Sequence, residues 1–121
     1  MSPAPEGLMD RLTERLKIES TAMRKDADTE ARIRELRVRV DEVDGELIRV
    51  LNERARIVQE IMAIKAETGA PIYDPRREEE ILRRVVDQNE GPIFDASMRD
   101  IFELILHRIR DMEMQRGEFS G

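Results

Sequence analysis

The chain has 121 residues, which corresponds to one domain by length, and its 40% charged and 3% aromatic residues argue against a β-sandwich and favour solvated helices. The absence of cysteine excludes disulfides and thiolate metal sites and fits a reducing cytoplasm, and the single histidine argues against a zinc site built from histidines. A net charge of −6 argues against general nucleic-acid binding, and no apolar run approaches the roughly 20 residues of a membrane span.

The first 28 residues are predicted to form an N-terminal tail that can hold a short amphipathic helix. Residues 1–7, MSPAPEG, have the composition of a disordered tail. Over residues 8–24 the apolar side chains recur at loosely helical spacing, at Leu8, Leu12, Leu16 and Met23. Asp28 or Thr29 is a suitable N-cap for the main helix that follows.

A long first helix is predicted from about residue 29 to residue 67. Its apolar residues recur close to a heptad at first, at positions 33, 36, 40, 43, 47, 50 or 51, 57 or 58, 61 and 64. Gly45 costs about 1 kcal/mol inside a helix and does not end it. At about 1.5 Å per residue the helix spans on the order of 57 Å, whereas a compact monomer of this size is roughly 35 Å across. The apolar stripe therefore needs a partner helix, most simply from a second copy of the chain.

Two shorter helices follow the long one. Gly69 ends the first helix, and a second helix is predicted over about 75–88 with apolar residues facing inward. The sequence NEGP at 89–92 ends the second helix, and a third begins near Asp95 or Ser97.

These elements predict an all-α fold, in which a three-helix protomer with one very long first helix forms an intertwined helical homodimer. The helical domain is predicted to cover residues 29–116, after the N-terminal tail 1–28, and residues 117–121 form a C-terminal tail.

Three cationic residues of the long helix are candidates for ligand binding. Arg54 falls on the apolar stripe, and Lys65, 11 positions later, lies on nearly the same face. Arg37 is 17 positions before Arg54, so it points roughly 100° away from it. Arg54 and Lys65 can therefore serve one pocket, while Arg37 can reach the pocket of a partner chain. The alternative for each is an ordinary solvated side chain.

The stretch YDPRREEEIL at 73–82 places charged residues at the start of the second helix. Arginine at a helix N-terminus opposes the helix dipole, so Arg76 and Arg77 are locally unfavourable there. If this turn faces Arg54 and Lys65, three cations surround one small volume, with two carboxylates, Asp74 and Glu78, at its edge. Arginines bind carboxylates through two hydrogen bonds, and helix N-termini favour anions. The pattern predicts a site for a small molecule that carries more than one carboxylate.

The segments LRVRVDEVDGELIRVLNERARIVQEI, PIYDPRREEEIL and NEGP, with lysine at 65, resemble the all-helical class of chorismate mutase over about residues 33–115. The closest resemblance is to the branch often fused to DAHP synthase, in which NEGP is typical. The resemblance implies that Arg37 enters the partner's site and binds a substrate carboxylate. Arg54 is similar to the carboxylate clamp that acts within its own chain. Lys65 resembles the lysine that donates to the ether oxygen and to a carboxylate.

The resemblance also assigns residues of the second and third helices. Asp74 and Glu78 are similar to the acidic residues around the substrate hydroxyl, and Arg77 to the arginine that supports the site. In the third helix Ile109 stands where the family often has a small polar residue. Glu113 stands at the position of the Gln or Glu that contacts the ether oxygen, and it can donate there only when protonated.

The implied activity is the pericyclic rearrangement of chorismate to prephenate in the biosynthesis of aromatic amino acids, which needs no metal and no cofactor. The implied setting is a cytoplasmic homodimer that binds a small dicarboxylate, does not bind nucleic acid or membranes, and can act with a DAHP synthase. Two alternatives stay open. One is an isochorismate-pyruvate lyase, and the other is a non-catalytic dimer that binds chorismate or prephenate and regulates DAHP synthase.

Overall fold

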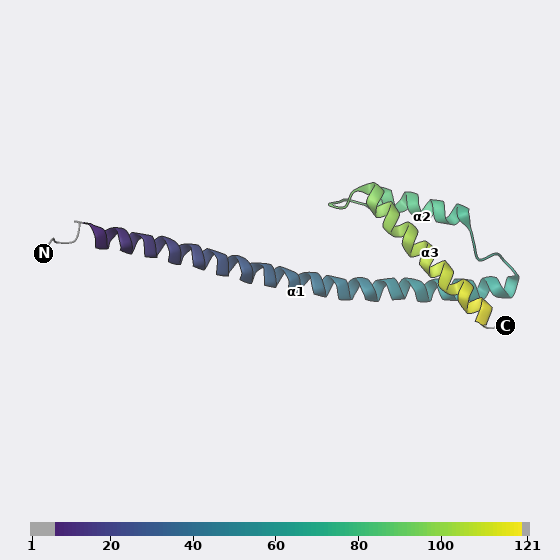
Figure 1. Cartoon of the computed structure of the whole chain (residues 1–121). Coiled ribbons are helices and arrows are strands. Elements are labelled where there is room, and N and C mark those ends of the chain that lie inside the picture. Colours follow the sequence, from purple (N-terminus) through teal and green to yellow (C-terminus); the bar gives the residue numbers. More distant parts are fainter. Residues whose placement is uncertain (1–6, 120–121) are drawn as a thin grey trace. The chain divides into compact units, whose positions relative to one another are not determined.

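A computed structural model describes residues 7–119, with side chains described up to residue 115. The described residues form three α-helices and no strand: α1 (Leu8–Thr68), α2 (Pro75–Gln88) and α3 (Asp95–Phe119) (Figure 1). The predicted all-α protomer with one long first helix is thereby confirmed. The chain divides into two compact units, residues 1–48 and 49–121, which are described in turn.

The helix α1 begins at Leu8, so the predicted start at Asp28 or Thr29 is wrong. The stretch from Leu8 to Asp44 contains neither glycine nor proline, so no residue there breaks the helix. Once a helix has formed, it continues through residues such as Asp28 and Thr29 that could also serve as an N-cap. The first backbone hydrogen bond of the helix shows this start, because the N–H of Arg11 donates to the carbonyl of Gly7 at 3.0 Å. Residues 1–6 of the predicted tail lie outside the described part of the chain.

The first unit exposes its apolar stripe. No described residue of α1 is buried. The stripe residues of this unit are between 42% and 66% exposed, and they are Ile33, Leu36, Val40, Val43 and Leu47. A regular apolar stripe of this length on a helix is typical of a surface that another helix covers. The homodimer stays a prediction, and this stripe is the feature that motivates it.

In the second unit, α1 ends in a Schellman turn. Gly69 adopts a positive φ of 72°, and the N–H of Ala70 donates to the carbonyl of Lys65 at 3.0 Å. This pairing satisfies one of the free carbonyls at the helix end and needs a residue that tolerates the left-handed region. Gly69 therefore fixes where the chain leaves α1, shortly after Lys65.

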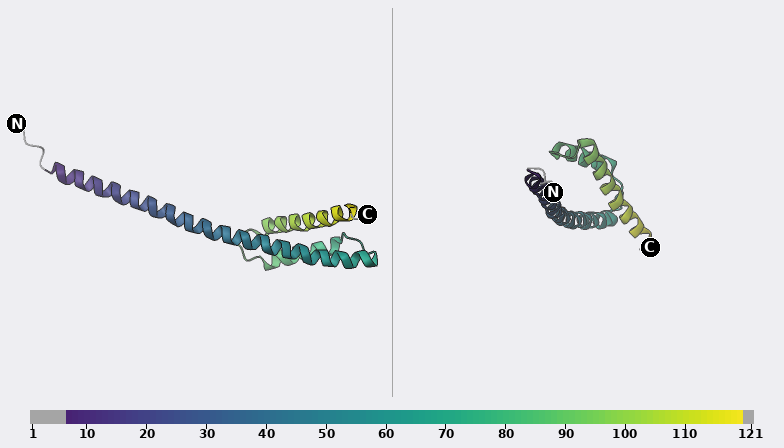
Figure 2. Two further views of the ribbon diagram at one scale, coloured as in Figure 1. Left: turned by 90° about the horizontal axis from the view of Figure 1, so that it is seen from below. Right: turned by 60° about the vertical axis from the view of Figure 1, so that its left-hand side comes forward.

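The helix α2 packs against α3, and the turn at 89–94 joins them (Figures 1 and 2). The side-chain amide of Asn89 fixes this turn, because it donates to the carbonyl of Ile93 and to Oδ1 of Asp95, both at 2.8 Å. The predicted second helix at 75–88 and the predicted third start at Asp95 are confirmed. The buried apolar side chains of the described residues are Leu82 of α2 and Leu106 of α3.

Replacing Leu82 by alanine should lower the free energy of unfolding by about 2–5 kcal/mol, because it leaves a cavity in a small core. Leu82 is 6% exposed, whereas Leu16, the matched control, is 66% exposed. Urea unfolding followed by the helical signal in circular dichroism measures both variants. An equal effect of Leu82→Ala and Leu16→Ala would show that the α2–α3 core does not stabilise the protein.

Candidate functional site

A pocket of about 300 Å³ lies in the second unit. It is formed by the last turns of α1, the connection before α2, the first turns of α2 and the middle of α3. Its lining residues are Arg54, Val58, Ile61, Met62, Lys65, Ile72, Asp74, Arg77, Glu78, Ile81, Leu106, Ile109 and Arg110. Six of the predicted site residues therefore line one pocket, namely Arg54, Lys65, Asp74, Arg77, Glu78 and Ile109.

The charged groups of the pocket are unlike those of the whole chain. Its lining carries four cationic side chains, of Arg54, Lys65, Arg77 and Arg110, and two carboxylates. The local balance is thus two positive charges (4 − 2) in a protein whose net charge is −6. A cleft with this excess attracts anions although the whole protein repels them.

Arg54 shows most directly that the cations crowd together. Burial, and to a smaller extent the neighbouring positive charge of Arg77, lowers the pKa of the Arg54 guanidinium from its ordinary value. Both effects disfavour the charged form, and a bound anion would offset both. Arg54 belongs to α1 and Arg77 to α2, so the pocket brings together two cations that are 23 positions apart in the sequence.

The N-terminus of α2 is built around Asp74. Its carboxylate caps the helix by accepting a hydrogen bond of 3.1 Å from the backbone N–H of Arg77, and Pro75 occupies the first helical turn. The guanidinium of Arg77 lies 3.5 Å from the carboxylate of Glu80. Asp74 and Glu80 thereby offset the unfavourable placement of arginine at this helix end. The cap also fixes the first turn of α2, from which Arg77 and Glu78 line the pocket.

The helix α3 adds a cation that the sequence analysis missed. Arg110 Nη1 lies 2.8 Å from Oε1 of Glu78, and both side chains are about one-fifth exposed, at 22% and 20%. The Arg110 guanidinium also lies 4.4 Å from the ring centroid of Tyr73. A signal was present in the sequence, because Arg110 follows Leu106 by one helical turn and so interrupts an apolar face in the same way as Arg54 does.

Two predicted site residues do not line the pocket. Arg37 belongs to the first unit, where its side chain is exposed on α1. Glu113 of α3 is only 8% exposed, and its Oε1 has no hydrogen-bond partner among the described residues. A buried carboxyl oxygen without a partner costs free energy, which makes Glu113 a candidate for a function rather than for stability.

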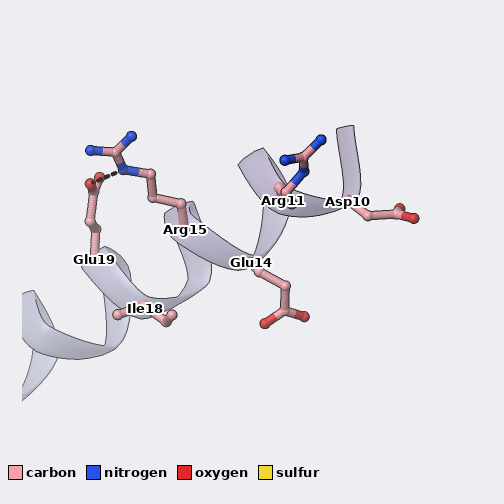
Figure 3. Close-up of a pocket in the computed structure, with 6 residues that line it drawn as sticks. All are labelled: Asp10, Arg11, Glu14, Arg15, Ile18 and Glu19. Atoms are coloured by element: carbon pink, nitrogen blue, oxygen red, sulfur yellow. Dashed lines mark ion pairs between the residues drawn. The ribbon is translucent and has the colours of Figure 1, made fainter. Parts of the chain in front are cut away.

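The N-terminal part of α1 also carries a surface depression (Figure 3). Its lining residues come from one stretch of helix, and they are Asp10, Arg11, Glu14, Arg15, Ile18 and Glu19. Charges of both signs alternate there, and the Nε of Arg15 pairs with Glu19 at 3.6 Å. Apart from the Arg15–Glu19 pair, the side chains drawn in Figure 3 point away from one another, so this depression lacks the convergent cations of the pocket in the second unit.

The part of the chain that the structure describes contains neither a candidate metal site nor a candidate membrane-spanning helix. No group of three or more His, Asp or Glu side chains there is arranged to hold a metal ion. None of the helices, searched over the same residues, is long and apolar enough to cross a membrane.

Comparison with known proteins gives consistent matches. The family model "Chorismate mutase type II" matches residues 36–114. Two solved structures of chorismate mutase from Thermus thermophilus are similar to the chain. Form I is 45% identical with a TM-score of 0.64, and the alignment covers 64% of this chain and 98% of that one. Form II is 44% identical with a TM-score of 0.67, covering 69% and 94%.

Curated relatives include longer proteins. A bifunctional chorismate mutase/prephenate dehydratase of Neisseria gonorrhoeae is 42% identical over 55% of this chain and 18% of its own length, and that of Aquifex aeolicus is 40% identical over 66% and 21%. This chain thus spans about a fifth of the length of these relatives. The chorismate mutase of Methanocaldococcus jannaschii is 27% identical over 69% of this chain and 86% of its own length. With a model that matches 79 of its 121 residues (36–114), the chain belongs to the chorismate mutase type II family.

Proposed function

We propose that this protein is a chorismate mutase, an isomerase that converts chorismate to prephenate in the biosynthesis of the aromatic amino acids phenylalanine and tyrosine. The observation that carries the proposal is the pocket in the second unit, where four cations and two carboxylates surround about 300 Å³. Chorismate carries two carboxylates and a hydroxyl, so it fits both the positive excess and the acidic groups. Membership of the chorismate mutase type II family and the Thermus thermophilus structures support the same activity.

The reaction needs orientation and charge stabilisation rather than a nucleophile. In the transition state the ether bond stretches and negative charge grows on its oxygen. Arg54 binds a substrate carboxylate and holds the enolpyruvyl arm over the ring, which converts a flexible reactant into a reactive conformer. Lys65, half-buried in the same lining, donates to the ether oxygen and stabilises the developing charge.

The α2 residues bind the other end of the substrate. Asp74 and Glu78 lie around the substrate hydroxyl, which donates its one hydrogen bond to Glu78, and Arg77 adds positive charge beside Arg54. Ile109 forms an apolar part of the wall and supplies no hydrogen bond.

We further propose that the protein is a homodimer in which Arg37 of each chain completes the site of the other. The exposed apolar stripe of the first unit supports this, because a second copy would cover it.

The proposed catalytic domain is residues 29–116. A cytoplasmic location and an association with DAHP synthase also stay predictions, and residues 117–119 of the predicted C-terminal tail continue α3. The association with DAHP synthase is tested by mixing the protein with the DAHP synthase of the same organism and measuring co-elution in size-exclusion chromatography.

The function is tested by incubating the pure protein with chorismate and following the loss of its ultraviolet absorbance. We expect the rate of chorismate loss to rise in proportion to the protein concentration and to saturate as the chorismate concentration is raised. A parallel reaction with isochorismate tests the lyase alternative, which requires faster turnover of isochorismate than of chorismate. Tight binding of chorismate by calorimetry without turnover would support the regulatory dimer and contradict the proposed activity.

Replacement of Glu113 by glutamine should raise kcat/KM for chorismate at neutral pH if Glu113 is the partner of the ether oxygen. Only a protonated carboxyl can donate to the ether oxygen, whereas the amide of glutamine donates at every pH. The measurement is kcat/KM for chorismate at neutral pH. The matched control is Glu103→Gln on the same helix, which lies outside the pocket lining. An unchanged or lower kcat/KM in Glu113→Gln would exclude Glu113 as the ether-oxygen partner and make Gln115 the next candidate.

A further inference from the structure

The wall that α3 contributes to the pocket contains an ion pair to which the sequence analysis assigned no role. Arg110 Nη1 lies 2.8 Å from Oε1 of Glu78, which is the geometry of a strong, charge-assisted hydrogen bond. The pair joins α3 to the first turn of α2, and both residues line the pocket. A pair that is only about one-fifth exposed is screened less by water than the surface pairs of the same helices.

Two neighbours define the position of this pair. The Arg110 guanidinium lies 4.4 Å from the centroid of the Tyr73 ring, within the range of a cation–π interaction. Tyr73 directly precedes the cap residue Asp74, so the ring that holds Arg110 belongs to the same turn that fixes Glu78. Arg110 is thus held from two sides, by the Glu78 carboxylate and by the Tyr73 ring.

The two oxygens of Glu78 differ in their surroundings. Oε1 accepts from Arg110, whereas Oε2 lies 3.9 Å from Nε2 of His107, which is beyond hydrogen-bonding distance. An ionised carboxylate has about four acceptor sites, so Glu78 keeps acceptor capacity after it has bound Arg110. Its second oxygen can accept from a hydroxyl in the pocket.

We propose that Arg110 is a positioning residue that holds the Glu78 carboxylate at the pocket wall, so that the second oxygen of Glu78 accepts a hydrogen bond from the substrate hydroxyl. The proposal rests on the proposed function, because it assigns Glu78 to the hydroxyl of chorismate. Arg110 then acts through Glu78 and does not bind the substrate itself. Removal of the Arg110 guanidinium should therefore lower kcat/KM only in a protein whose Glu78 can accept that hydrogen bond.

A double-mutant cycle tests this dependence. Arg110→Met keeps much of the length of the side chain and removes the charge, and it should lower kcat/KM for chorismate by about 10-fold, the scale for losing a hydrogen bond to a charged group. In the Glu78→Gln background the same change should alter kcat/KM by less than about twofold, because the two residues act as one unit. Arg110→Lys keeps the charge without the planar guanidinium and should recover part of the loss. It also replaces Arg110→Met in the cycle if the methionine variant does not fold.

The chain offers a matched control in a second ion pair between α2 and α3. Arg99 Nη2 lies 3.2 Å from Oε2 of Glu79, and neither residue lines the pocket. Arg99→Met breaks this pair and should leave kcat/KM unchanged. An equal loss in Arg99→Met and Arg110→Met would mean that Arg110 only holds the two helices together, and it would overturn the proposal.

The remaining outcomes separate this proposal from the proposed function. An active wild type in which the losses of Arg110→Met and Glu78→Gln multiply would overturn the positioning role, because Arg110 would then contact the substrate directly. The chorismate mutase activity would stand in that case. A wild type that neither converts nor binds chorismate would overturn the proposed function, and the role of Arg110 with it.

Discussion

Replacement of Lys65 by alanine should lower kcat/KM for chorismate at least about 100-fold, the scale for losing one preorganised donor to a developing oxyanion. Lys65 is half-buried in the pocket lining, one helical turn before Gly69 ends α1. Its ammonium group is the only lysine donor in that lining, and alanine removes this proposed donor to the ether oxygen. The loss should appear mainly in kcat, because the charge on the ether oxygen grows only in the transition state.

The fold of this variant should be intact. Alanine is a good helix former, and the backbone carbonyl of Lys65, which accepts from Ala70, is unaffected by the substitution. Circular dichroism checks this point. Lys25→Ala is the matched control, because Lys25 lies on the same helix outside the pocket in the second unit and should keep normal activity. Near-normal turnover in Lys65→Ala would show that Lys65 is only a solvated lysine.

Mixing a chain that carries Arg37→Ala with a chain that carries Arg54→Ala should restore activity that neither variant has alone. The reason is the proposed origin of each site, with Arg54 from one chain and Arg37 from the other. In a heterodimer of the two variants, one site then has both arginines and the other has neither. The expected activity is about half that of the wild type, since one of two independent sites is intact.

The heterodimer is isolated by tagging the two chains differently and purifying over both tags. The two homodimeric variants, measured at the same concentration, give the background activity. If each site took both arginines from one chain, every site of the heterodimer would lack one of them. A purified heterodimer with no more activity than the two parents would therefore contradict the shared site, and so would a folded, active monomer.

The second and third helices were predictable because local signals mark their ends. Proline at 75, the cap at Asp74 and the NEGP turn set the bounds that the structure has. The start of α1 was not predictable in this way, because Asp28 and Thr29 fit an N-cap and a helix interior equally well. Only the continuity of the helix through Leu8 decides between the two.

The shared face of Arg54 and Lys65 was predictable from periodicity, whereas the approach of the second helix to that face was only a condition of the predicted site. Arg54 and Lys65 share a helix face, and the turn after Gly69 returns the start of α2 toward that face, which brings Asp74, Arg77 and Glu78 into the same lining. Their roles in the reaction stay predictions.

The contribution of α3 was less predictable, because it depends on how that helix is rotated about its axis. The sequence does not show which of several neighbouring residues of α3 face the pocket. The structure places Ile109 and Arg110 in the pocket lining and leaves Glu113 buried outside it. The proposed role of Arg37 depends on a second chain, which one sequence does not describe.

The central claim is that this chain rearranges chorismate within its positively charged pocket. Proton NMR of chorismate incubated with the pure protein tests it most directly, because the substrate and each product give distinct signals. The account predicts that prephenate appears in the same amount as chorismate disappears, that no pyruvate forms, and that Lys65→Ala slows the conversion at least about 100-fold. Unchanged chorismate, or release of pyruvate in place of prephenate, would contradict it.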